Sequence, residues 1–130
     1  MSYESRFIFA IVPQFNVNFK SDKKKWCRHF AEFKLSKFNG SPKCFDKESE
    51  YFFYGYDGNT QVLKDFYDEP LTQCTFKKFV EWINQDIETL EDEVNFEIGN
   101  DNLFMSLKTY TNSLKYLCDT EEIIVLHFGC

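Results

Sequence analysis

Residues 86–102, "DIETLEDEVNFEIGNDN", contain a dense group of acidic side chains with no Lys or Arg among them. Carboxylates at this density suit two kinds of chemistry, which are coordination of a divalent cation and docking of a positively charged partner. Like charges so close together repel, so the segment costs stability unless it is well solvated or bound by something positive. The seven acidic residues are Asp86, Glu88, Glu91, Asp92, Glu93, Glu97 and Asp101.

Metal coordination is the first of these possibilities. The string "GNDNLF" is rich in oxygen ligands, but it lacks the D-x-[DN]-x-[DN]-G spacing of a calcium loop, and such residues also suit a turn. Cys27-x-His29 and His127-x-x-Cys130 would give a Cys2His2 set only if distant parts of the chain met. We therefore expect no metal and no other cofactor.

The sequence contains no recognisable catalytic motif. The chain has two histidines, neither in a recognisable catalytic frame, and it lacks GxSxG, HExxH, a phosphate-binding glycine loop and a dinucleotide fingerprint. This favours a binding protein over an enzyme. The alternative from another class is a small Mg²⁺-dependent enzyme that acts on nucleic acid or nucleotides through the carboxylates.

Charge is distributed unevenly along the chain. Residues 1–47 hold ten Lys or Arg and four Asp or Glu, for a net +6, while residues 48–130 hold five and seventeen, for a net −12. The segment "KSDKKKWCRHF" interleaves basic and aromatic residues as nucleic-acid-binding proteins do. The total charge of −6 opposes phosphate binding, so we expect no direct nucleic-acid contact.

Length and composition indicate one globular domain over residues 1–130. The first residues show no basic leader or cleavage site, and the apolar runs are too short to cross a bilayer. Five widely spaced cysteines without a CxxC pair suit reduced thiols. These features predict a cytoplasmic protein that has no membrane partner and whose cysteines are all reduced.

The first half of the chain alternates predicted strands and one helix. An apolar run over residues 7–12 predicts a buried strand. Trp26, Phe30 and Phe33 recur at helical spacing and predict a helix over residues 21–38. The Asp57-Gly58 dipeptide then predicts a hairpin with strands over residues 50–56 and 60–66.

Residues 75–92 contain the clearest amphipathic pattern, which predicts a single helix. On its polar face, Lys77 and Lys78 come first and the acids come last. This order is unfavourable for a helix dipole, so we interpret the acids as serving something other than helix stability. The apolar stripe comprises Phe76, Phe79, Val80, Ile83, Ile87 and Leu90.

The last third is predicted to hold a hairpin and one ambiguous element. Residues 94–110 alternate apolar and polar side chains on both sides of "GNDN", which predicts two strands. Within residues 112–128, Asp119 and Glu122 resemble a helix capping box, whereas β-branched Ile123–Val125 favour a strand. The capping box tips the expectation towards a helix. The fold class is then α+β: a single domain with a mainly antiparallel sheet packed by two or three helices.

With rings and carboxylates crowded into "FVEWINQDIETLEDEVNFEIGNDNLF", this small acidic α+β chain resembles the immunity proteins of bacterial polymorphic toxin systems, including those of contact-dependent growth inhibition. The resemblance implies a non-enzymatic inhibitor of one cognate toxin domain, often a nuclease, and it carries over no specific residues. From the charges themselves, the seven acids of residues 86–102 are the candidate contacts with a basic partner. A phage-encoded acidic inhibitor of a host defence nuclease is an alternative that shares the same physics.

Overall fold

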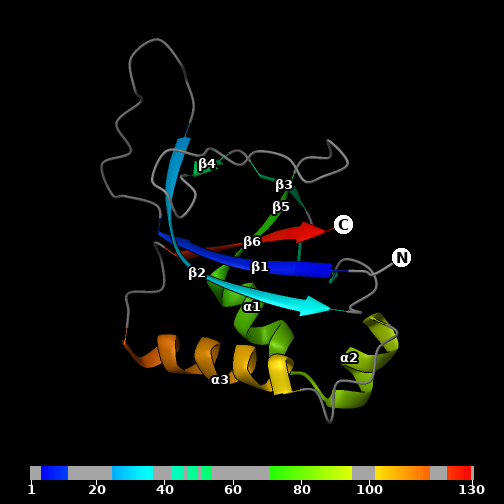
Figure 1. Cartoon of the computed structure of the whole chain (residues 1–130). Coiled ribbons are helices and arrows are strands. Elements are labelled where there is room, and N and C mark those ends of the chain that lie inside the picture. The colour runs from blue at the N-terminus through cyan, green and yellow to red at the C-terminus, as the bar shows by residue number, and fades with distance from the viewer. Residues whose placement is uncertain are drawn as a thin grey trace.

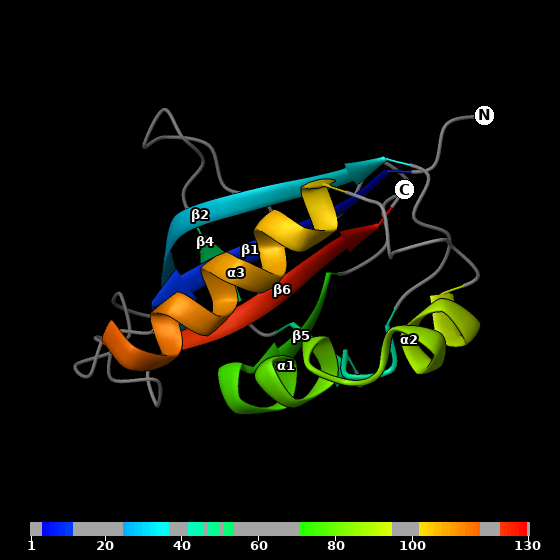
Figure 2. The same cartoon turned by 90° about the horizontal axis from the view of Figure 1, so that it is seen from below.

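The computed structural model describes residues 4–11, 25–36, 42–45, 47–49, 51–53, 71–94, 102–117 and 123–129, and the statements below concern these residues. They form one sheet with the helices on one face, which confirms the predicted α+β class (Figures 1 and 2). In chain order the elements are β1 (Glu4–Ile11), β2 (Lys25–Ser36), β3 (Lys47–Glu48), β4 (Tyr51–Phe53), β5 (Thr72–Thr75), α1 (Phe76–Ile83), α2 (Ile87–Val94), α3 (Asn102–Leu117) and β6 (Ile123–Gly129).

The sheet has the strand order β3-β5-β6-β1-β2-β4. Every neighbouring pair is antiparallel except β2 and β4, which run parallel. β1 and β6 occupy the centre of the sheet, and residues 7–10 and 123–128 are buried throughout. A continuous apolar run is what a strand buried on both faces requires, so the strand predicted over residues 7–12 is confirmed as β1.

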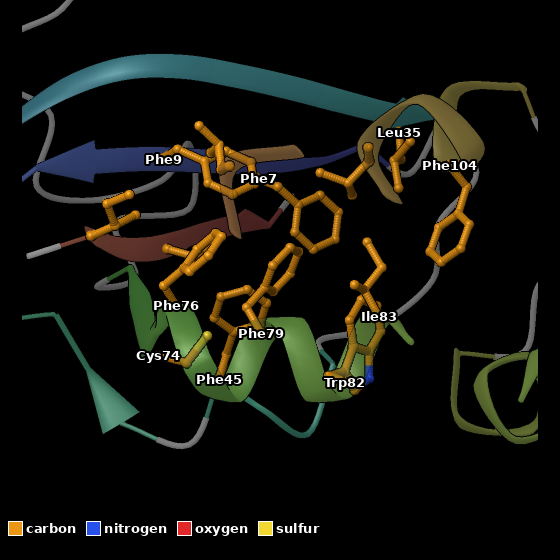
Figure 3. Packing of buried hydrophobic residues seen from close by; sticks show 14 of the residues in the cluster. Phe7, Phe9, Leu35, Phe45, Cys74, Phe76, Phe79, Trp82, Ile83 and Phe104 are labelled. Atoms are coloured by element: carbon orange, nitrogen blue, oxygen red, sulfur yellow. The ribbon is translucent and has the colours of Figure 1, made fainter. Parts of the chain in front are cut away.

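The main core lies between the sheet and the helices, and aromatic rings dominate it (Figure 3). Phe9 is fully buried on β1 and contacts rings from three other elements. Ring pairs with centroids about 5 to 7 Å apart in tilted or edge-on arrangements add to the burial of apolar area. The ring partners of Phe9 are Phe30 and Phe33 from β2, Phe76 and Phe79 from α1, and Tyr110 from α3.

A smaller apolar cluster lies on the other face of the sheet. Along β1, Phe7 and Phe9 belong to the main core, whereas Ile8 and Ala10 belong to this second cluster. The alternation follows from strand geometry, in which successive side chains point to opposite faces. The cluster consists of Ile8, Ala10, Cys27, Leu71, Ile124, Leu126 and Phe128.

The helix predicted over residues 21–38 is wrong, because Lys25–Ser36 forms β2. Its residues pair with the whole of β1, and the register shifts between Phe9 and Ala10. This irregularity leaves an extra residue on β2, so Phe30 packs against the main core together with Ala31 and Phe33. A bulged strand therefore produced the three-residue spacing that the sequence pattern attributed to a helix.

The helix favoured within residues 112–128 is wrong for the second half, because Ile123–Gly129 forms β6, while residues 112–117 are the end of α3. β6 pairs with β1 on one side and β5 on the other. Its β-branched residues fit this position because both faces of the strand are buried. Asp119 and Glu122, on which the expectation of a capping box rested, lie outside the described residues.

The single helix predicted over residues 75–92 is two helices, α1 and α2. Thr75 caps α1 by accepting a 3.2 Å hydrogen bond from the Lys78 backbone N–H. At the other end, the Asn84 side-chain amide donates to the Val80 carbonyl at 2.8 Å. The Asn84 backbone N–H donates to the same carbonyl at 3.2 Å, so Asn84 is the C-cap of α1, and a new helix begins at Ile87.

The hairpin predicted over residues 94–110 is wrong at both of its described ends. Val94 is the last residue of α2, and α3 begins at Asn102. Phe104, Leu107 and Leu114 are buried at helical spacing in the main core. Residues 95–101 lie outside the described residues, as does the predicted Asp57-Gly58 turn; of that hairpin the structure describes only β4. No helix in the described parts of the chain has both the length and the apolar character needed to cross a membrane.

Candidate functional site

The structure places five of the seven predicted contact residues on or next to α2. Both views show this helix at the margin of the helix layer (Figures 1 and 2). Asp86, Glu88 and Asp92 are exposed, and Glu91 and Glu93 are half-buried. Glu97 and Asp101 lie outside the described residues. The acidic run is therefore concentrated, in its described part, on one short helix.

The break between α1 and α2 changes the meaning of the charge order. Asp86 directly precedes α2, and Glu88 lies in its first turn. Acidic side chains at a helix N-terminus are stabilising by about 0.3 to 1 kcal/mol each. The interpretation that all the acids oppose the helix dipole is therefore wrong for Asp86 and Glu88, and it remains valid for Glu91 and Asp92 in the second half of α2.

Glu93 has a structural role that the sequence did not reveal. Its Oε2 accepts a 3.0 Å hydrogen bond from Nε1 of the buried Trp82, and its Oε1 accepts a hydrogen bond from the Lys43 backbone N–H. In Figure 3 the Trp82 indole nitrogen lies on the side of the ring away from Phe79. Both carboxylate oxygens of Glu93 thus connect α2 to α1 and to residues 42–45, and no local pattern signals a pair eleven residues apart.

An exposed apolar side chain lies among the remaining acids. Ile87 is 40% exposed although the sequence pattern placed it in the buried stripe of one long helix. The break at residues 84–86 resets the helical phase, and Leu90 instead becomes the fully buried residue of α2. We call the surface formed by Asp86, Ile87, Glu88, Glu91 and Asp92 the acidic α2 surface.

A shallow pocket of about 310 Å³ lies over the Trp82–Glu93 contact. Two lysines, Lys43 and Lys78, and two glutamates, Glu81 and Glu93, contribute to its lining. The formal charges in this lining cancel, so the pocket has no strong preference for an anion or a cation. The half-buried Cys44 thiol also lines the pocket, and no histidine among the described residues does.

Of the Cys2His2 set, Cys130 lies outside the described residues, and the sheet separates His127 from Cys27 and His29. His127 lies in the main core, where its ring is 5.3 Å from that of Phe7 and 5.2 Å from that of Phe45. Cys27 belongs to the cluster on the other face, and His29 pairs in register with Ala10 of that same cluster. Among the described residues, no group of three or more His, Cys, Asp or Glu side chains is placed to hold a metal ion.

A further contact that sequence reasoning missed joins α1 to α3. The side-chain amides of Asn84 and Asn112 exchange two hydrogen bonds, of 2.8 and 3.1 Å. Asn84 therefore both ends α1 and connects it to α3. The sequence shows Asn84 as a polar residue inside the amphipathic pattern. It does not identify the partner of Asn84, which is 28 residues away.

Comparison of the chain with protein-family models, with curated proteins and with solved structures finds no match in any of the three. The distinctive feature of the site is the acidic α2 surface, in which an exposed apolar side chain is flanked by carboxylates.

Proposed function

We propose that this protein is a non-enzymatic immunity protein that binds and neutralises a basic toxin domain, a nuclease, in the cytoplasm of the cell that makes it. The observation that carries the proposal is the acidic α2 surface. α2 contains Glu88, Glu91, Asp92 and Glu93 and no Lys or Arg, and the sequence has no basic residue from Phe79 to Leu107.

The physics of this surface suits a basic partner. A nuclease cleft is positively charged because it must hold phosphate, and a carboxylate-rich surface attracts such a cleft from a distance and accelerates association. Ile87 gives the surface an apolar centre. Protein interfaces typically draw most of their affinity from a few such buried anchors, while the charged rim sets orientation and association rate.

Glu93 is excluded from the proposed contacts because the fold uses both of its carboxylate oxygens. Asp86 and Glu88 have two roles in the proposal, since they favour the start of α2 and also form part of the rim. Asp92 is the cleanest candidate, because it is exposed and lies in the last turn of α2, where an acid does not help the helix.

Co-expression tests the proposal in the cell. The partner to test is any toxic domain encoded directly upstream of this chain's gene, produced from an inducible promoter in a host without natural immunity. We expect co-expression of this chain to restore growth, and purified chain to inhibit the nuclease at equimolar ratio. Continued killing at equal expression of both proteins contradicts the proposal. A gene neighbourhood of phage genes with no toxin gene favours the anti-defence inhibitor instead.

Titration calorimetry with Mg²⁺ and Mn²⁺ separates the binding protein from the enzyme alternative. The proposal predicts no stoichiometric heat of binding from either cation. Uptake of one cation per chain at micromolar affinity, lost in a variant with Asp92→Asn and Glu88→Gln, supports the enzyme.

A further inference from the structure

Among the strands that the structure describes, one long edge of the sheet is open along β2. β1 pairs with β2 from Glu4↔Ser36 to Ile11↔Arg28, but β4 pairs with β2 only over Lys25–Cys27. Figure 1 shows β2 curving between these two neighbours, and Figure 2 shows it along the border of the sheet beside α3. Within the described part of the chain, no strand pairs with the outer side of residues 28–36. Such an edge is a template for another strand.

A shallow groove of about 680 Å³ runs beside this edge. Its lining combines Phe33 of β2 with residues of α3 that include Met105 and Tyr110, and the rings of Phe33 and Tyr110 are 5.1 Å apart. Met105 is 39% exposed, and Leu103 on the same helix is 51% exposed. The open strand edge is thus accompanied by apolar surface that a paired strand and its neighbouring helix would cover.

The two residues that flank Phe33 carry opposite charges, so this part of β2 is complementary in charge to a second, antiparallel copy of itself. Glu32 and Lys34 flank Phe33 and lie opposite Ile8 and Arg6 of β1 in the register. Ile8 belongs to the cluster on the helix-free face, so Glu32 and Lys34 share that face by strand alternation. A two-fold axis through Phe33 would place each Glu32 opposite Lys34 of the other copy.

We propose that two copies of this chain pair antiparallel through the outer edge of β2, with the two-fold axis at Phe33. The two sheets then form one continuous sheet, and the two α3 helices flank the axis on the same face. Two Glu32–Lys34 pairs form on the opposite face. This inference does not depend on the proposed toxin partner.

Charge and strand regularity both select this register. A two-fold axis at Glu32 or at Lys34 would place identical charges directly opposite each other, which is unfavourable. An axis at Ala31 would oppose Arg28 and Lys34 and would extend the pairing across the bulge next to Phe30. Only an axis at Phe33 gives opposite charges within the regular part of the strand.

Glu32 gives independent support for an incoming cation. Its side chain is only 10% exposed, and Oε1 lies 3.7 Å from Nε of Arg6. Oε1 also accepts no hydrogen bond from the residues that the structure describes. A buried carboxylate oxygen normally has a donor. In the proposed dimer, Lys34 of the second copy adds a cation near the Glu32 carboxylate on the side away from Arg6.

Sedimentation equilibrium of the purified full chain tests the proposal. We expect a monomer–dimer equilibrium in the parent protein and dissociation that increases with salt, since dissolved ions screen the attraction between the oppositely charged copies. Lys34→Glu places a second carboxylate opposite Glu32 of the other copy and should raise the dissociation constant roughly tenfold to a hundredfold. Lys47→Glu, the same charge change on exposed β3 at the other edge of the sheet, should leave it unchanged.

A mixing experiment separates the interface from any folding defect. Glu32→Lys alone should also be monomeric, whereas an equimolar mixture of Glu32→Lys and Lys34→Glu should form a heterodimer because every pair is again opposite in charge. Circular dichroism verifies that each variant is folded. If Glu32→Lys is unfolded, the dissociation constants of Lys34→Glu and Lys47→Glu still test the proposed interface. A monomeric parent protein at high micromolar concentration overturns the proposal, as does a Lys34→Glu variant that dimerises as well as the parent.

Discussion

The indole Nε1 of Trp82 and the carboxylate Oε2 of Glu93 are 3.0 Å apart and join α1 to α2. The other oxygen of Glu93 accepts a hydrogen bond from the Lys43 backbone. Hydrogen bonds to a charged group are about twice as strong as neutral ones. One acidic side chain of the acidic run therefore fixes the position of the helix that displays the others.

Replacing Glu93 by Ala should lower the free energy of unfolding by about 1 to 3 kcal/mol, because the Trp82 N–H loses its acceptor in a largely buried position. Glu93→Gln, which keeps one oxygen acceptor, should lower the free energy of unfolding by a smaller amount. Asp92→Ala on the same helix is the matched control and should change stability by no more than about 0.5 kcal/mol. Urea unfolding followed by tryptophan fluorescence measures all three. Equal effects of Glu93→Ala and Asp92→Ala would show that the bridge contributes nothing.

Stability should depend on pH through His29. Burial lowers the pKa of His29 from its ordinary value of 6.5, although the Glu32 carboxylate and a backbone hydrogen bond at Ala31 oppose the shift. The unfolded chain then binds the proton more readily, so this contribution to stability is present above about pH 6.5 and decreases as the pH falls below it. Unfolding measured between about pH 7.5 and about pH 5.5 should show this decrease, and His29→Gln should reduce it. An unchanged slope in His29→Gln would rule His29 out as its source.

The thiols should differ sharply in reactivity. Burial raises the pKa of Cys27 to about 12, so almost none of it is thiolate at neutral pH, and Cys74 is buried as well. Cys44 is only half-buried. Timed alkylation of the native protein with iodoacetamide, followed by peptide mass spectrometry, should label Cys44 well before Cys27 and Cys74. Labelling of all three thiols at one rate would contradict this prediction. The same experiment without reductant tests whether all five cysteines are reduced.

The sequence predicted the elements whose apolar pattern has only one interpretation. β1 follows from a continuous apolar run, and α1 follows from Phe76, Phe79 and Ile83 at helical spacing. β2 could not be predicted in this way, because the bulge beside Phe30 gives a strand the spacing of a helix. Residues 123–129 form a strand because they pair with β1 on one side and β5 on the other. This pairing depends on the whole fold and cannot be seen in the local sequence.

The candidate site was predictable in composition but not in geometry. The concentration of acids over residues 86–93 is visible in the sequence, and the structure places these residues on or beside one short helix. The exposure of Ile87 and the use of Glu93 by Trp82 depend on the break at Asn84, which separates two helices that the periodicity joins. Tertiary hydrogen bonds therefore decide which of the acids the fold itself uses, as Glu93 shows.

The most direct test of the proposed function is the affinity of Asp92→Lys for the toxic domain encoded upstream, measured by titration calorimetry beside the parent protein. A lysine in the last turn of α2 suits the helix dipole, so this variant should fold as well as the parent. Glu48→Lys, an equal charge reversal at an exposed position on β3, is the control, and Ile87→Ser tests the apolar centre of the surface. The account predicts at least roughly tenfold weaker binding for Asp92→Lys and for Ile87→Ser, a loss of about 1.4 kcal/mol or more, with little change for Glu48→Lys. If Asp92→Lys and Ile87→Ser bind the toxic domain as tightly as the parent does, the acidic α2 surface is not the interface.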